Sequence, residues 1–102
     1  MRIDGHKFEY NGETFELRCS HYVNNRLAIR VLSNGEPYTV LTVNIPAFGL
    51  GKKEIIVKTW SENKDICKIV LNNTNLFEDT DIQIPTGFCE ASVWKFAKDV
   101  EP

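Results

Sequence analysis

RLAIRVLSNGEPYTVLTVNI, residues 26–45, consists of two strand-forming runs that meet at Asn34-Gly35. Asn-Gly readily takes the two consecutive positive φ angles of a type I′ turn, so this dipeptide between two such runs predicts a β-hairpin. Asn11-Gly12 repeats the signal between the strand-forming residues 6–10 and 13–22. Two hairpins in the first half of the chain predict a mostly antiparallel β domain.

Working outward, an alternation of apolar and polar side chains indicates further strands. Phe15, Leu17 and Cys19 share one face of the run 13–22, which is typical of a half-buried strand. The runs 26–32 and 37–45 carry apolar residues on both faces, so we expect both strands to be central in the sheet. Strands are expected at residues 6–10, 13–22, 26–32, 37–45, 54–60, 80–84 and 88–96.

The spacing changes from strand to helix after Trp60. Ser61 is a candidate N-cap, and Ile66, Ile69 and Val70 follow at helical spacing. A helix is therefore predicted at residues 62–73, ending in the asparagine-rich stretch 72–75. The expected fold is α+β, in the order βββββαββ. A twisted antiparallel sheet of six or seven strands carries the helix on one face, in a single domain over residues 1–102. Disorder is expected only in residues 98–102.

Composition narrows the classes of function. The chain has 102 residues, 42% of them hydrophobic and 25% charged, with a formal net charge of −2, which is ordinary for one globular domain. Non-specific nucleic-acid binding needs a strong excess of Lys and Arg, so a nucleic-acid partner is disfavoured. The three cysteines are widely spaced, the N-terminal residues are polar, and no run approaches the ~20 apolar residues of a membrane span. These features predict a cytoplasmic protein without a membrane partner.

Few side chains group in a way that indicates chemistry. Cys19 and His21 lie two residues apart on one strand, but a zinc site needs two more ligands, and Cys19 continues an apolar face. The acidic run at residues 78–81 lacks the glycine and the distal glutamate of a calcium loop. We therefore expect no metal, no cofactor and no catalytic residue.

Aromatic side chains are the best candidates for binding. Trp94 and Phe96 share one face of the last strand, where coverage by other elements is expected to be thin, and we expect them to form an exposed contact patch. Trp60, Glu62 and Asn63 lie at the strand-to-helix junction, where function often concentrates. Helix capping and a hydrophobic anchor also explain these residues, together with Ser61, and this structural interpretation is favoured over a binding role.

A pocket between the sheet and the helix is a second possibility for binding. Tyr38, Thr42, Asn44 and Trp60 are the residues expected to line it.

Several segments resemble those of a small, uncharacterised bacterial family associated with mobile elements and phages of gut bacteria. The resemblance covers most of the chain, roughly residues 7–90. The stretches 41–46 and 61–63 are moderately specific. The segments that carry the resemblance are Tyr10-Asn11-Gly12, Asn25-Arg26-Leu27-Ala28-Ile29, Gly35-Glu36-Pro37-Tyr38, Leu41-Thr42-Val43-Asn44-Ile45-Pro46, Lys58-Thr59-Trp60-Ser61-Glu62-Asn63 and Pro85-Thr86-Gly87-Phe88. The resemblance implies a genetic context and carries over no catalytic residue.

Three functions follow as hypotheses. The leading hypothesis is a non-enzymatic accessory or modulator protein of a mobile element or phage, which acts by binding a protein partner. The alternative is a module that binds a small ligand or a nucleotide. An enzyme is the least supported, because no set of reactive residues converges. Exposed edge strands of such a sheet would also allow pairing in a homodimer.

Overall fold

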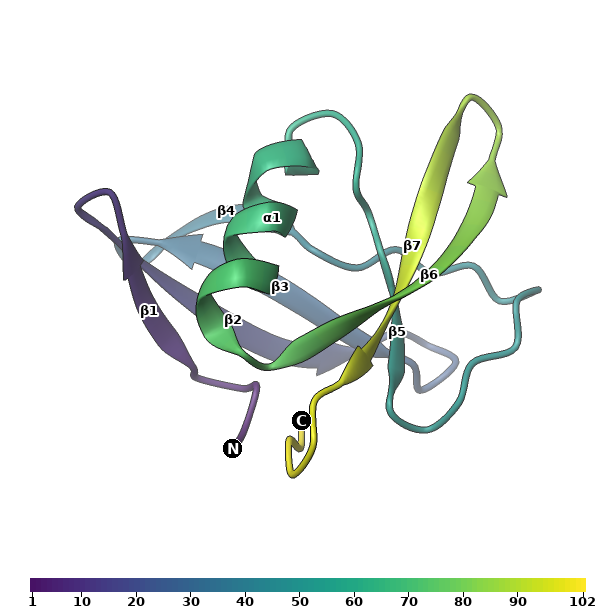
Figure 1. The fold of residues 1–102 in the computed structure, drawn as a ribbon, viewed down its shortest axis with the longest axis horizontal. Coiled ribbons are helices and arrows are strands. Elements are labelled where there is room, and N and C mark those ends of the chain that lie inside the picture. The colour runs from purple at the N-terminus through teal and green to yellow at the C-terminus, as the bar shows by residue number, and fades with distance from the viewer.

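The computed structural model of residues 1–102 contains one helix and seven strands in the order βββββαββ (Figure 1), which confirms the predicted α+β class. All strand pairs within the sheets are antiparallel. The elements are β1 (Lys7–Tyr10), β2 (Glu13–His21), β3 (Leu27–Ser33), β4 (Glu36–Val40), β5 (Glu54–Val57), α1 (Asn63–Thr74), β6 (Phe77–Thr86) and β7 (Cys89–Phe96).

The two Asn-Gly dipeptides form the predicted turns. Asn11 and Gly12 join β1 to β2 with φ angles of 49° and 80°, and Asn34 and Gly35 join β3 to β4 with 50° and 83°. Consecutive positive φ angles are the signature of a type I′ turn, whose twist matches that of the flanking strands. The local sequence therefore sets the register of both hairpins.

The strands divide into two sheets, where the sequence suggested one. The sheet orders are β1-β2-β3-β4 and β5-β7-β6. β4 ends at Val40 because the next residues pair with both sheets: the Leu41 amide donates to the Ile29 carbonyl, and the Val43 amide donates to the Ile56 carbonyl. Residues 41–43 therefore join the two sheets, and β4 is an edge strand of the first sheet. The expectation that it is central was wrong.

The main core lies between the two sheets and the helix. α1 contacts both β1 and β6, which are edge strands of the first and the second sheet. Val100 is buried in this core, so the last residues pack against the domain where a disordered tail was expected. The core residues are Ile3, Phe15, Leu17, Ile29, Val31, Leu41, Ile55, Val57, Ile66, Cys67, Val70, Leu76, Phe77, Trp94, Phe96 and Val100.

A smaller apolar cluster covers the opposite face of the second sheet. Ile56, Ile84, Ala91 and Val93 form its centre. The long β4–β5 connection folds over them and contributes Val43, Ile45, Phe48 and Leu50, while Trp60 packs at the side. Because these side chains are partly buried, the connection is held against the sheet although it contains no regular structure.

The helix begins at Asn63, close to the predicted start, but its first turn is built differently. Ser61 has a φ angle of 56° and does not cap the helix; Glu62 occupies the N-cap position without a side-chain hydrogen bond. The Asn63 amide bonds to the Trp60 carbonyl instead, and the Lys64 amide to the Ser61 carbonyl. The helix ends as predicted, with Asn75 in the left-handed conformation that often follows a helix.

Candidate functional site

Three connections between strands lie towards the same end of the molecule's long axis, on the right of Figure 1. They are the β2–β3 turn (residues 22–26), the β4–β5 connection (residues 41–53) and the β6–β7 turn (residues 87–88). We refer to these three segments together as the loop face. Binding residues are found disproportionately on loops that a rigid scaffold positions, so this end is the first place to look for a site.

Arg26 fastens the β2–β3 turn to the β4–β5 connection. Its guanidinium donates to the carbonyl oxygens of Ile45 at 2.7 Å, Pro46 at 3.4 Å and Phe48. A planar guanidinium with five N–H groups can donate to three separate carbonyl oxygens at once, whereas an ammonium presents only three donors on a flexible stem. The arginine therefore shapes the loop face by satisfying carbonyl groups of a segment that lacks regular structure.

Two further contacts strengthen the same junction. The Asn24 side-chain amide donates to Oδ1 of Asn44 at 3.1 Å. The hydroxyl of Tyr22 lies 3.0 Å from the Thr42 hydroxyl and donates to the Thr42 carbonyl oxygen at 3.2 Å. Asn44, a predicted binding residue, thus lies within the loop face, where it holds two of its segments together.

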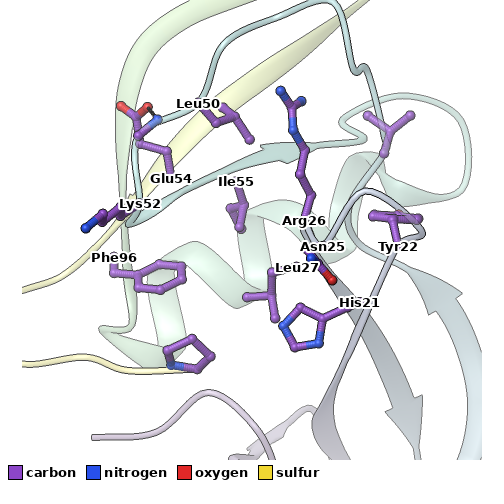
Figure 2. A pocket seen from close by; sticks show the side chains of 13 residues that line it. His21, Tyr22, Asn25, Arg26, Leu27, Leu50, Lys52, Glu54, Ile55 and Phe96 are labelled. Carbon is purple, nitrogen blue, oxygen red and sulfur yellow. Dashed lines mark hydrogen bonds between the residues drawn. The ribbon is translucent and has the colours of Figure 1, made fainter.

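A cleft of about 270 Å³ opens between the β2–β3 turn and the start of β5 (Figure 2). Leu27 and Ile55 lie at its centre, and the ring of Phe96 points towards them. His21, Asn25, Lys52 and Glu54 supply polar groups around this apolar wall. A concave site with an apolar lining and a few polar groups has the composition of a small-molecule site.

The loop face exposes several apolar side chains. Val23 in the β2–β3 turn and Phe88 in the β6–β7 turn are fully exposed, more than any other large hydrophobic side chain of the protein. Pro46 and Ala47 in the β4–β5 connection are exposed as well. Each of the three segments therefore presents at least one apolar side chain to the solvent.

The expectation of an exposed patch at Trp94 and Phe96 was wrong. Trp94 is 2% exposed and Phe96 is 7% exposed, and both belong to the main core. β7 is the central strand of the second sheet, so its inward face meets the core. The ring centroid of Phe77 lies 5.5 Å from that of Trp94 and 6.2 Å from that of Phe96. Phe96 also lines the cleft described above.

The strand-to-helix junction is held mainly by packing and hydrogen bonds. Asn63 is fully buried, accepts a hydrogen bond from the Thr39 hydroxyl at 2.5 Å and donates to the Val40 carbonyl at 2.8 Å. Glu62 is exposed and accepts a bond from Lys58 at 2.8 Å, which lowers the pKa of the Glu62 carboxyl.

Trp60 is half-buried at the same junction and packs against the smaller apolar cluster. The ammonium of Lys58 lies 5.9 Å from the centroid of its ring. The interpretation as a hydrophobic anchor holds for Trp60. The predicted side-chain cap does not form, because Glu62 at the N-cap makes no capping bond and the Asn63 side chain bonds to β4.

The predicted pocket lined by Tyr38, Thr42, Asn44 and Trp60 does not form, because these residues are dispersed. Tyr38 is 54% exposed, packs its edge on Phe15 and lines a groove of about 460 Å³ beside α1. Thr42 is buried, with its hydroxyl accepting a bond from the Ile29 amide at 3.1 Å. The split of the sheet after Val40 separates Tyr38 from the other three.

Cys19 and His21 point to different neighbours. The Cys19 thiol lies 3.9 Å from the Pro102 carbonyl, while His21 lines the cleft. Burial and the Asp4 carboxylate raise the pKa of Cys19 to about 11, and burial raises that of Cys67 to about 12. No group of three or more His, Cys, Asp or Glu side chains is arranged to hold a metal ion.

Sequence reasoning did not identify Val23, Arg26, Lys52 or Phe88 as site residues. A signal existed for Phe88, which directly follows the turn sequence Pro85-Thr86-Gly87. The sequence pattern assigns it to the last strand, whereas in the structure β7 begins at Cys89 and Phe88 lies in the turn. The sequence carries no such signal for Arg26 or Lys52, because the acceptors and the cleft wall that define their roles come from distant parts of the chain.

No helix of the protein has both the length and the hydropathy that crossing a membrane requires. Comparison with models of protein families, with curated proteins and with solved structures gives no significant match.

Proposed function

We propose that this protein is a non-enzymatic binding module that recognises a protein partner through its loop face. The single observation that carries the proposal is the full exposure of Val23 and Phe88, on two different segments at one end of the molecule. An isolated exposed apolar side chain needs no explanation. We take these two together because they stand on loops at the same end of the molecule.

The energetics favour an occupied state of this surface. Burying a Phe or Val side chain is worth about 1.5–3 kcal/mol relative to leaving it in water. Aromatic residues are enriched in protein interfaces, where they fill pockets of the partner. Phe88 at the hairpin tip has the geometry of such an anchor, because nothing in the protein itself covers it.

The scaffold lowers the entropic cost of binding. Arg26 and Asn24 tie the β2–β3 turn to the β4–β5 connection, and the smaller apolar cluster ties that connection to β6 and β7. Segments that are already ordered lose less conformational freedom when a partner binds. A standard interface takes ~800 Å² from each partner. This is a small part of the 6242 Å² surface, so one end of the molecule is large enough.

The cellular setting forms part of the proposal. All three cysteines are free thiols in the structure, which suits a reducing cytoplasm. We place the protein there as an accessory of a mobile element or phage. This context rests on the sequence resemblance and stays a prediction.

The experiment places a photo-crosslinking amino acid at position 88 or position 23 and, as a control, at position 10. Tyr10 is also exposed and apolar, but it belongs to β1, outside the loop face. We expect one protein of the encoding organism to be cross-linked from positions 88 and 23, and not from position 10, after nuclease treatment of the lysate.

The captured partner is then purified and its affinity measured. We expect Phe88→Ser to weaken binding at least tenfold, and Val40→Ser, an exposed apolar position on β4, to leave it unchanged. Cross-linking from position 10 alone, or equal affinity of the Phe88→Ser and wild-type proteins, would refute binding through the loop face.

A further inference from the structure

We infer that the cleft of Figure 2 binds a small organic anion with a flat apolar body. This ligand site is separate from the exposed tips of the loop face and does not depend on the proposed protein partner. Its basis is the joint occurrence of an apolar wall and a local excess of cationic side chains.

The centre of the cleft is apolar and is formed in part by core residues. Ile55 and Phe96 belong to the main core, and Leu27 packs against it. Figure 2 shows the Phe96 ring directed towards Leu27 and Ile55 across the cleft, so a flat ligand entering there meets hydrocarbon on several sides. At about 270 Å³ the cleft is just below the ~300–1,000 Å³ of drug-sized sites, which limits the ligand body to one or two rings.

Cationic side chains gather around this wall. Lys52 and Arg26 line the cleft itself, together with the imidazole of His21. Lys52 also lines a neighbouring cleft of about 420 Å³, which shares Phe96 with the first and adds Arg2 and Lys53. Four side chains with a full positive charge therefore surround two adjoining clefts in a protein whose net charge is −2.

The acidic groups nearby compensate for this charge only in part. Glu54 and Glu101 are the carboxylate side chains that line the two clefts, and Glu54 already accepts a hydrogen bond from the Gly51 amide at 2.7 Å. None of the four cations takes part in an ion pair, since the ion pairs of the protein involve Arg18 and Lys58. Figure 2 shows the Lys52 ammonium directed outward at the rim of the cleft, where its flexible stem can turn to a ligand carboxylate or sulfonate. The Arg26 guanidinium is bonded to carbonyls of the β4–β5 connection and acts on the ligand only through its charge.

The test compares three probes that share a naphthalene ring and carry an anionic, a neutral or a cationic group at the same position: 2-naphthoate, 2-naphthylmethanol and 2-naphthylmethylamine. Each is titrated into ¹⁵N-labelled protein and followed by amide chemical shifts. We expect 2-naphthoate to shift the amides of Leu27, Lys52 and Ile55 in a saturable way. The alcohol should bind at least fivefold more weakly, and the amine should not bind measurably.

Variants then separate the cleft from general surface attraction. Lys52→Glu reverses a charge at the mouth and should weaken 2-naphthoate binding at least tenfold. Lys52 is exposed, so the fold should tolerate the change. Lys7→Glu is the matched control, because Lys7 is an exposed lysine on β1 that lines neither cleft. Phe88→Ser should bind the probe like wild type.

Three results would overturn the inference. They are equal binding of all three probes, shifts that map away from the cleft, and equal weakening by Lys52→Glu and Lys7→Glu. Each is distinct from a failure of the protein-binding proposal, whose readout depends on Phe88.

Discussion

Asn63, the first residue of α1, accepts a hydrogen bond from the hydroxyl of Thr39 in β4, with 2.5 Å between the oxygens. The other half of the same amide donates to the adjacent carbonyl of Val40. Asn63 therefore uses both ends of its side chain to fasten the helix to a sheet edge. It also covers one main-chain acceptor of that edge, which would otherwise be available for pairing with another strand.

Replacement of Asn63 by Ala should cost about 1–3 kcal/mol of folding free energy, because two partly buried hydrogen bonds, from the Thr39 hydroxyl and to the Val40 carbonyl, are lost. Urea unfolding followed by circular dichroism measures this loss. The control is Asn73→Ala, which removes a bond from an exposed asparagine to the Ile69 carbonyl and should cost under ~1 kcal/mol. Equal losses for the two variants would contradict the bridging role.

Asn63→Asp should be more harmful at neutral pH than at pH 4. An ionised carboxylate at position 63 can still accept a hydrogen bond from the Thr39 hydroxyl. Its second oxygen, however, would face the Val40 carbonyl oxygen, so two acceptors would meet inside the protein without a donor between them. A protonated carboxyl regains a donor for that carbonyl. The difference in stability between this variant and wild type, measured by urea unfolding at both pH values, should therefore narrow on acidification; a gap that widens would refute the explanation.

Gly35→Ala should destabilise the protein by about 1 kcal/mol through backbone strain. Gly35 has a φ angle of 83°, which L-residues adopt only at a cost of this size, although a Cβ there would meet no neighbouring atom. Gly49→Ala is the matched control, since Gly49 also has open space around its Cα and does not have a positive φ. Thermal unfolding of both variants separates backbone strain from steric contact.

Arg26→Ala should loosen the loop face and leave the sheets ordered. The carbonyls of Ile45, Pro46 and Phe48 lose their shared donor, so amide hydrogen exchange should speed up in residues 41–53 far more than in β2 or β7. Arg26→Lys should restore the protection only in part, because an ammonium has a different donor geometry. Arg30→Ala, at an exposed arginine of β3, should change none of these rates; uniform acceleration after Arg26→Ala would instead indicate a global loss of stability.

Iodoacetamide should modify Cys89 before Cys19 and Cys67. The thiolate is the reactive form, and the pKa values of Cys19 and Cys67, about 11 and about 12, keep both protonated at pH 8. Modification of Cys19 should become faster as the pH rises towards 11. Peptide mapping by mass spectrometry gives the three rates, and Cys89→Ser should remove the fast phase. Rapid modification of Cys67 at pH 8 in folded protein would contradict its burial in the core.

Features that depend on neighbouring residues along the chain could be predicted from the sequence. Asn11-Gly12 and Asn34-Gly35 determined two hairpins, because the conformational preference of each dipeptide is local. The alternation at Phe15 and Leu17 determined which face of β2 is buried, and the spacing of Ile66 and Val70 did the same for α1. The order of elements followed from these patterns.

Features that depend on distant partners were decided by the tertiary structure. Leu41 and Val43 read as a continuation of β4, yet their amides bond to carbonyls on two different strands, and this pairing divides the sheet. Trp94 is buried because β7 is the central strand of the second sheet. The alternation of apolar and polar residues within β7 does not determine the position of the strand in the sheet. The cleft and the loop face arise where segments far apart in the sequence meet, so short-range patterns carry little information about Arg26 or Lys52.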